Sequence, residues 1–164
     1  MSLLRTKPTR RFVVLAPLAL AACGFEPVYG PGGNGASLQN RVLVDPPSTQ
    51  DGYLLVRELE EKLGRAAQPA FALSLTINTA ETRLAIDREG DTGRLNRIGI
   101  VDYSLRNVAT GQIVTSGQVE NFVGSSATGT TVETLAGEQD AQKRLMKVIA
   151  DQIIARLYAA DLSA

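Results

Sequence analysis

The sequence predicts an α+β fold: a two-layer sandwich of order β-α-β-β-β-α, with two helices packed on one face of a mixed four-stranded sheet. Two segments repeat apolar residues at four-residue spacing, which is typical of amphipathic helices. Residues 71–78 instead alternate apolar and polar side chains, the period of a half-buried strand. Two further strand-like segments follow, joined by a tight turn at residues 109–111, which predicts a three-stranded meander.

The first strand and first helix are predicted over residues 41–63. A short strand at residues 41–45 is stopped by Pro46 and Pro47, because proline cannot donate to a sheet ladder. Ser48 and Asp51 resemble a capping box, which predicts a helix over residues 51–63. Its apolar stripe is formed by three leucines, and Gly64 is placed to end it; the leucines are Leu55, Leu59 and Leu63.

The meander and the last helix account for the rest of the domain. The apolar residues are odd-numbered over 71–77, whereas Leu84 and Ile86 are even-numbered. This switch of face predicts a bulge or bend near residues 79–83. Strands are expected at residues 95–107 and 112–123, with a polar turn at 87–93 and a loop at 124–130. A helix over residues 132–158 follows, with an apolar face made of Leu145, Ile149, Ile153 and Leu157, widened by Val148 and Ile154.

The N-terminus has the pattern of a bacterial lipoprotein signal peptide. Four basic residues precede an apolar segment at residues 12–22, which falls well short of the ~20 residues needed to span a bilayer. The segment ends in the lipobox Leu20-Ala21-Ala22-Cys23. We therefore expect removal of residues 1–22 and acylation of Cys23 with a thioether-linked diacylglycerol, to which many Gram-negative bacteria add a third acyl chain such as palmitate. Gly24, in place of an aspartate, favours the outer membrane.

The predicted organisation is a lipidated flexible tether at residues 23–37 and a single domain at residues 38–164. Glycines and Pro31 disfavour regular structure in the tether. The glycine-rich part of the tether, residues 29–37, has about nine residues and spans roughly 15–18 Å. The domain is therefore expected to work close to its own membrane.

Composition excludes several classes of function. The chain has 17 basic and 17 acidic residues, and removing the four basic residues of the leader leaves a net charge near −4. Binding to nucleic acid is not expected at this charge. Histidine is absent and the only cysteine is the predicted lipidation site, so neither histidine-dependent catalysis nor a zinc or copper site is expected. The sequence predicts a binding or assembly protein without catalytic residues, metal or cofactor.

The mature chain resembles the LptE family of lipopolysaccharide-assembly lipoproteins, particularly its alphaproteobacterial branch. The octapeptide Cys23-Gly24-Phe25-Glu26-Pro27-Val28-Tyr29-Gly30 is similar to the start of mature family members. The resemblance continues at residues 97–105, 137–140 and 150–157. It implies two helices against a mixed sheet, and an outer-membrane lipoprotein facing the periplasm.

The resemblance also implies partners. Family members plug a large β-barrel protein, LptD, assist its assembly, and take part in lipopolysaccharide transport to the outer leaflet. An alternative function is that of an auxiliary lipoprotein of an ABC-type envelope lipid transporter. A third is that of an envelope enzyme activator, which would need a longer tether than this one.

Candidate lipopolysaccharide contacts are four arginines around the polar turn: Arg83, Arg88, Arg94 and Arg97. Arginine binds phosphate bidentately, and the family resemblance implicates a basic residue in this turn. Because Asp87, Glu89 and Asp91 interleave with the arginines, a solvated turn of paired charges is the competing interpretation. A second basic site of the family falls here near Ala136-Gly137, and Lys143 and Arg144 are interpreted as the outer face of the helix.

Overall fold

The computed structural model describes residues 28, 30, 33–86, 92–126 and 131–162. The predicted signal peptide, the lipidation site Cys23 and the turn residue Arg88 lie outside these described residues. The elements in chain order are α2 (Asn34–Leu38), β1 (Val42–Val44), α3 (Gln50–Leu63), β2 (Phe71–Ile86), β3 (Thr92–Asn107), β4 (Ile113–Ser126) and α4 (Thr131–Ala159).

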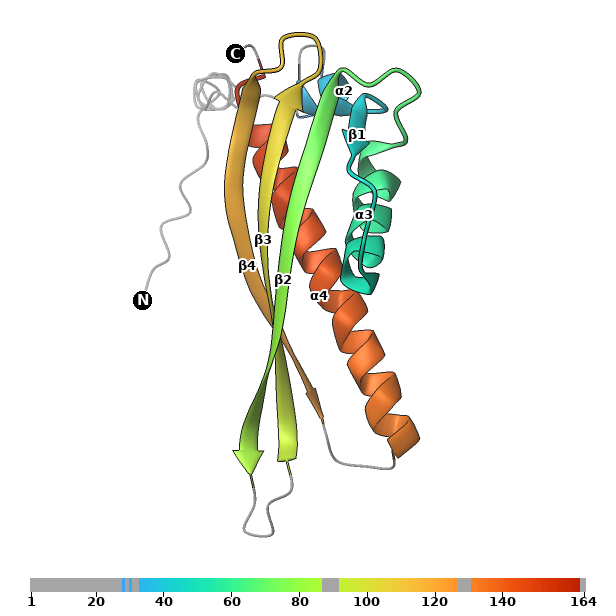
Figure 1. The fold of residues 1–164 in the computed structure, drawn as a ribbon, viewed down its shortest axis with the longest axis vertical. Helices are drawn as coiled ribbons and strands as arrows, with labels where there is room; N and C mark the ends of the chain where they lie inside the picture. The colour runs from blue at the N-terminus through green and yellow to red at the C-terminus, as the bar shows by residue number, and fades with distance from the viewer. Residues whose placement is uncertain (1–27, 29, 31–32, 87–91, 127–130, 163–164) are drawn as a thin grey trace, which may run out of the picture.

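The four strands form one mixed sheet in the order β1-β2-β3-β4. β1 pairs in parallel with the start of β2, and the last bond of this pair runs from the Asp45 N–H to the Leu73 carbonyl at 3.0 Å. β2, β3 and β4 form an antiparallel meander. Figure 1 shows the three long strands twisting strongly along their length.

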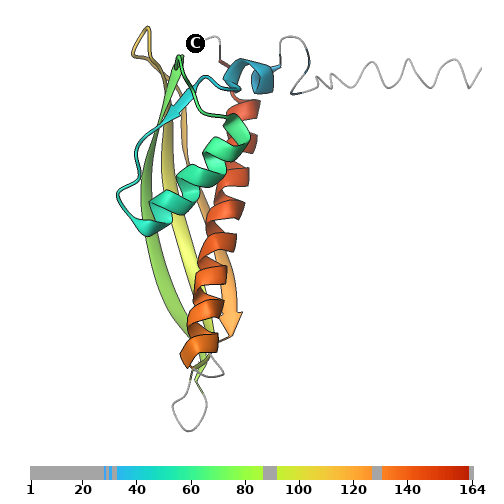
Figure 2. The same ribbon diagram turned by 90° about the vertical axis from the view of Figure 1, so that its right-hand side faces the viewer.

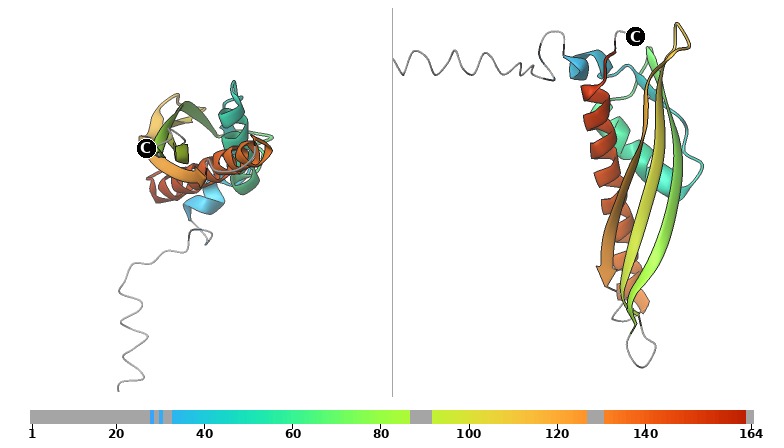
Figure 3. Two further views of the ribbon diagram at one scale, coloured as in Figure 1. Left: turned by 90° about the horizontal axis from the view of Figure 1, so that it is seen from below. Right: turned by 90° about the vertical axis from the view of Figure 1, so that its left-hand side faces the viewer.

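Both long helices lie on one face of the sheet. α4 runs the whole length of the strands and packs on β3 and β4, whereas the shorter α3 packs beside α4 and β1 over one half only (Figures 1 and 2). The sheet and the helices are therefore two layers, as Figure 3 shows along and across the molecule. The predicted α+β sandwich is confirmed, with the short α2 as an additional element.

The predicted helix stripes form the core. Seven of these side chains are completely buried: Leu55, Leu59, Leu63, Leu145, Ile149, Ile153 and Leu157. They pack against the inner positions of the sheet, among them Leu73, Val101, Leu105 and Val119. Tyr103, 5% exposed, lies over Gly117, where an added Cβ would come within 2.9 Å of the tyrosine hydroxyl oxygen. Gly117 is thus needed to leave room for the buried ring.

Three local predictions at the helices are wrong. The N-cap of α3 is Thr49, not Ser48, and its hydroxyl oxygen accepts from the Gly52 N–H at 3.0 Å. Residues 34–37, predicted to lack regular structure, belong to α2. Val148 was expected on the apolar face of α4 but is 37% exposed, because that face is already filled by Met146 and Ala150.

The strands also extend further than predicted. β2 pairs with β3 in one register from Phe71 to Ile86, without the bulge expected near residues 79–83. Residues 78–82 are exposed whichever face of the sheet they lie on, so apolar side chains are not required at every second position there. The switch in the apolar pattern therefore needs no bulge. β4 includes residues 124–126, which were predicted as a loop, because they pair with Arg94, Leu95 and Asn96 of β3. The irregularity in the meander lies instead at Leu105/Arg106, between β3 and β4.

Candidate functional site

The two predicted arginines with described side chains lie on opposite faces of the sheet. Arg94 is exposed on the outer face, in register with Leu84 and Ser126, and has no ion-pair partner among the described residues. Arg97 lies on the helix-covered face, is 20% exposed and forms an ion pair with Glu81 across the β2–β3 ladder. Arg94 is therefore available to a ligand, whereas Arg97 is engaged in linking two strands.

The remaining members of the predicted cluster are placed only in part. The backbone of Arg83 pairs with Leu95, two positions along the ladder from the Arg97–Glu81 pair. Arg88 lies outside the described residues. The structure thus brings the backbones of Arg83, Arg94 and Arg97 to one end of the hairpin, with the side chains of Arg94 and Arg97 on opposite faces, and contact with lipopolysaccharide stays a prediction.

The outer face of α4 carries the second group of basic residues. Lys143 and Arg144 are both exposed, and Arg144 Nε lies 2.8 Å from Asp140 Oδ2, one turn away. An exposed pair of this kind contributes ~0–1 kcal/mol. The pair is typical of a solvated helix face.

Asp51 joins three elements at the N-terminus of α3. Its Oδ1 accepts from Gln142 Nε2 of α4 at 2.6 Å, and its Oδ2 accepts from Thr79 Oγ1 of β2 at 2.9 Å. The carboxylate also lies in the first helical turn, where negative charge is favourable. At the other end of α3, Lys62 forms an ion pair with Asp151 of α4. These polar contacts hold α3 against α4 and the sheet; the sequence indicated only the position of Asp51 near a helix start.

Asn34 attaches the start of the described domain to the end of α4. Its Nδ2 donates to the carbonyl of Tyr158 at 2.9 Å and to the carbonyl of Ala160 at 2.6 Å. The side chain thus satisfies carbonyls that a helix end leaves without intrahelical partners. No pattern in the sequence indicated this contact, because 124 and 126 residues separate the partners.

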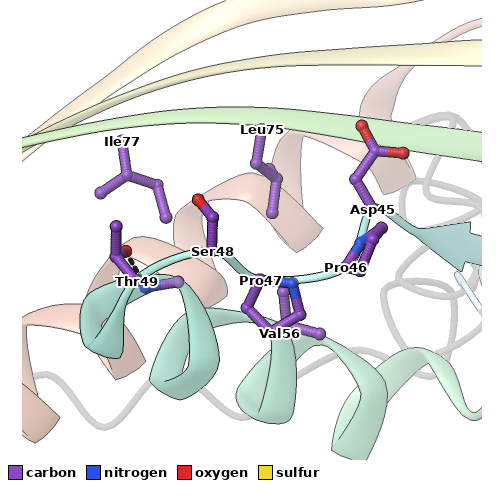
Figure 4. A pocket seen from close by; sticks show the side chains of 9 residues that line it. Asp45, Pro46, Pro47, Ser48, Thr49, Val56, Leu75 and Ile77 are labelled. Carbon is purple, nitrogen blue, oxygen red and sulfur yellow. Dashed lines mark hydrogen bonds between the residues drawn. The ribbon is translucent and has the colours of Figure 1, made fainter.

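A small cavity of about 80 Å³ lies between α3, β2 and the segment that follows β1. Pro46 and Pro47 cannot continue the pairing with β2, so the chain leaves the sheet edge before α3 begins. Figure 4 shows Leu75 and Ile77 of β2 facing this segment, with Val56 of α3 beyond it. The cavity is far smaller than the 300–1,000 Å³ typical of a ligand site.

The outer face of the sheet is polar over its middle. Three consecutive cross-strand rows contribute mainly serine, threonine, amide and carboxylate groups, and Gln118 Nε2 donates to Asp102 Oδ1 at 2.8 Å. The rows are Ser74/Ser104/Ser116, Thr76/Asp102/Gln118 and Asn78/Ile100/Glu120. An apolar row of Ala80, Ile98 and Phe122 follows, and Phe122 is 63% exposed.

Within the described residues, no cluster of three histidine, cysteine or acidic side chains could hold a metal ion. None of the described helices combines the length and apolar character needed to cross a membrane. The described residues thus form a small α+β domain with buried apolar helix stripes and an exposed sheet face that is polar over its middle.

The particular family follows from the sequence comparison. The family model described as LptE: Lipopolysaccharide-assembly matches residues 39–157, so the chain belongs to the LptE family. This is a non-enzymatic family of membrane-associated envelope lipoproteins, and membership supports a role in lipopolysaccharide assembly. Among curated protein sequences none matches the chain.

Solved structures share the fold. A protein of Caulobacter crescentus CB15 is 22% identical with a TM-score of 0.67, and the match covers 79% of this chain and 96% of that one. Rare lipoprotein B from Shewanella oneidensis is 14% identical with a TM-score of 0.56, over 73% and 92% of the two chains. Lipoprotein B from Nitrosomonas europaea is 14% identical with a TM-score of 0.54, over 83% and 91%. At these identities the similarity establishes the fold alone.

Proposed function

We propose that this chain is an outer-membrane lipoprotein that plugs an LptD-type β-barrel and assists its assembly, taking part in lipopolysaccharide transport to the outer leaflet. The observation that carries the proposal is the family match, which extends from the end of α2 to the last turn of α4. Acylation of Cys23, after cleavage of residues 1–22, attaches the domain to the periplasmic face of the outer membrane. The protein works by binding, without catalysis.

The outer sheet face supports the role of a plug. The lumen of a large membrane β-barrel is polar. The three polar rows at the middle of this face are therefore suited to contact the lumen wall. The long twisted meander and α4 form an elongated body (Figure 1). Since α4 has 29 residues, this body is about 44 Å long, enough to reach far into a barrel.

Arg94 and Arg88 are the proposed contacts with lipopolysaccharide phosphates. Support for Arg94 comes from its exposure and from its lack of an ion-pair partner among the described residues. Arg88 is proposed from the sequence. The engaged Arg97 is a weaker candidate, because binding a phosphate would release Glu81 from its ion pair.

The proposal is tested by affinity purification of the lipidated protein from detergent-solubilised outer membrane. Recovery of one large β-barrel protein in near-equal amount is expected. Recovery of inner-membrane or periplasmic transporter components without a barrel would contradict the plug and favour an auxiliary lipoprotein of an ABC-type transporter.

Lipopolysaccharide contact is tested separately by charge reversal. We expect Arg94→Glu and Arg88→Glu to lower lipopolysaccharide binding several-fold, measured with the purified protein. Arg57→Glu is the matched control, because Arg57 is an exposed arginine on α3, away from the hairpin end. Equal binding by all three variants would remove the arginines from the mechanism while leaving the barrel interaction standing.

A further inference from the structure

Three exposed aliphatic residues gather at the end of the molecule where α2, the β3–β4 turn and the C-terminus meet. Leu43 is 51% exposed, Val108 51% and Ile113 57%. Leu43, Ala72, Arg106 and Ile113 form one continuous row across the outer sheet face. Val108 follows in the turn, where its N–H donates to the Ala70 carbonyl at 2.9 Å.

Two exposed arginines accompany the aliphatic residues. Arg106 lies within the row, between Ala72 and Ile113. Arg41 lies at the adjacent corner, because its carbonyl accepts from the Ala70 N–H at 2.9 Å. Neither guanidinium has an ion-pair partner in the part of the chain that the structure describes. Exposed aliphatic and cationic side chains together are the composition that membrane surfaces bind.

Three mainly polar rows follow this one on the same face and separate it from the apolar row of Ala80, Ile98 and Phe122. The aliphatic residues are therefore not the margin of a larger apolar face. Figures 1 and 2 both place the β3–β4 turn beside α2 and the C-terminus, with the β2–β3 hairpin end and the start of α4 at the opposite end.

The chain itself brings a membrane to this end. Asn34 fixes α2 to the last carbonyls of α4, and only ten residues separate it from Cys23. Val28, only five positions after Cys23, also lies at this end, because its carbonyl accepts from the Gly35 N–H at 2.9 Å, and five residues reach at most about 18 Å. An acylated Cys23 therefore holds this end of the domain close to the bilayer.

We propose that, before the domain enters a barrel, Leu43, Val108 and Ile113, with Arg41 and Arg106, form a surface that lies on the phospholipid bilayer in which Cys23 is anchored. The aliphatic side chains enter the headgroup region and the guanidiniums bind lipid phosphates. Arg94 lies at the opposite end of the sheet from this surface. This inference rests on the acylation in the proposed function.

The test uses the lipidated mature chain in vesicles of phosphatidylethanolamine and phosphatidylglycerol. Because the natural Cys23 is acylated, a cysteine introduced by Val108→Cys or Ile113→Cys is a unique site for an environment-sensitive fluorophore. Glu120→Cys is the matched control, on the same strand and exposed on the outer face. We expect spin-labelled lipid to quench the fluorophores at 108 and 113 at least threefold more than the one at 120.

Charge and anchoring are checked in the same vesicles. Reversal by Arg41→Glu with Arg106→Glu is expected to lower the quenching at position 108, whereas Arg57→Glu leaves it unchanged. Equal quenching at 108, 113 and 120 in protein that floats with the vesicles would overturn the inference while leaving acylation intact. Protein that does not float would overturn acylation and this inference with it. Fluorophores shielded only by an added barrel protein would make the surface a protein contact instead.

Discussion

Asp51 offers the sharpest test of how α3 is held in place. Replacement by alanine removes both the bond from Gln142 and the bond from Thr79. Gln142 is only 9% exposed, so its amide would lose its partner in a nearly water-free position. The loss of that charge-assisted bond is expected to cost about 1.5–2 kcal/mol.

Two smaller terms add to this loss. The Thr79 bond is exposed and is expected to contribute about 0.5 kcal/mol. The negative charge in the first turn of α3 contributes about 0.5 kcal/mol through the helix dipole. Asp51→Ala is therefore expected to lower the free energy of unfolding by about 2.5–3 kcal/mol.

The measurement is urea unfolding of the mature chain carrying Cys23→Ser, which removes the proposed acylation site. Thr79→Val is the control and is expected to lose only about 0.5 kcal/mol. A double-mutant cycle of Asp51→Ala with Gln142→Met should give a coupling of about 1–1.5 kcal/mol. A loss below about 0.5 kcal/mol for Asp51→Ala, or strictly additive effects in the cycle, would refute the reasoning.

Four further substitutions have definite expected outcomes in the same unfolding assay. Thr49→Ala should cost about 1 kcal/mol and Ser48→Ala close to nothing, because only Thr49 caps α3; the reverse order would restore the capping box inferred from sequence. Asn34→Ala should cost about 1 kcal/mol and speed amide exchange in the last turn of α4, and unchanged exchange would contradict the cap. Gly117→Val should cost about 1–3 kcal/mol by overpacking and lower the near-ultraviolet circular dichroism of Tyr103; a stable variant with an unchanged tyrosine signal would show that the ring has room to move.

The helices were predictable because burial of an apolar stripe dominates their energetics. Leu145, Ile149 and Ile153 stand four residues apart and are all completely buried in the structure. The choice between two adjacent hydroxyls as N-cap was not predictable in this way. Ser48 and Thr49 both offer an oxygen, and the path of the chain after Pro46-Pro47 decides which one meets the Gly52 N–H.

The candidate site was less predictable because it depends on strand register. Arg94 and Arg97 are close in sequence, yet an odd separation along a strand places them on opposite faces. The partner of Arg97 is Glu81, and only the pairing of β2 with β3 brings the two together. Similarly, α2 is a five-residue helix with a glycine N-cap and a second glycine at its second position, and contacts with the end of α4 stabilise it where local propensity does not.

The unequal lengths of α3 and α4 divide the sheet into two mechanically different halves. In β3, Val101, Tyr103 and Leu105 are buried in the half of the sheet that both helices cover, whereas Leu95 and Arg97, on the same face nearer the hairpin end, are only half-buried. Fewer buried apolar contacts lower the free energy of local opening. Hydrogen exchange along this one strand should therefore speed up toward the hairpin, so that the strand is a rigid base at one end and an adaptable tip at the other, able to adjust its twist to the surface it meets.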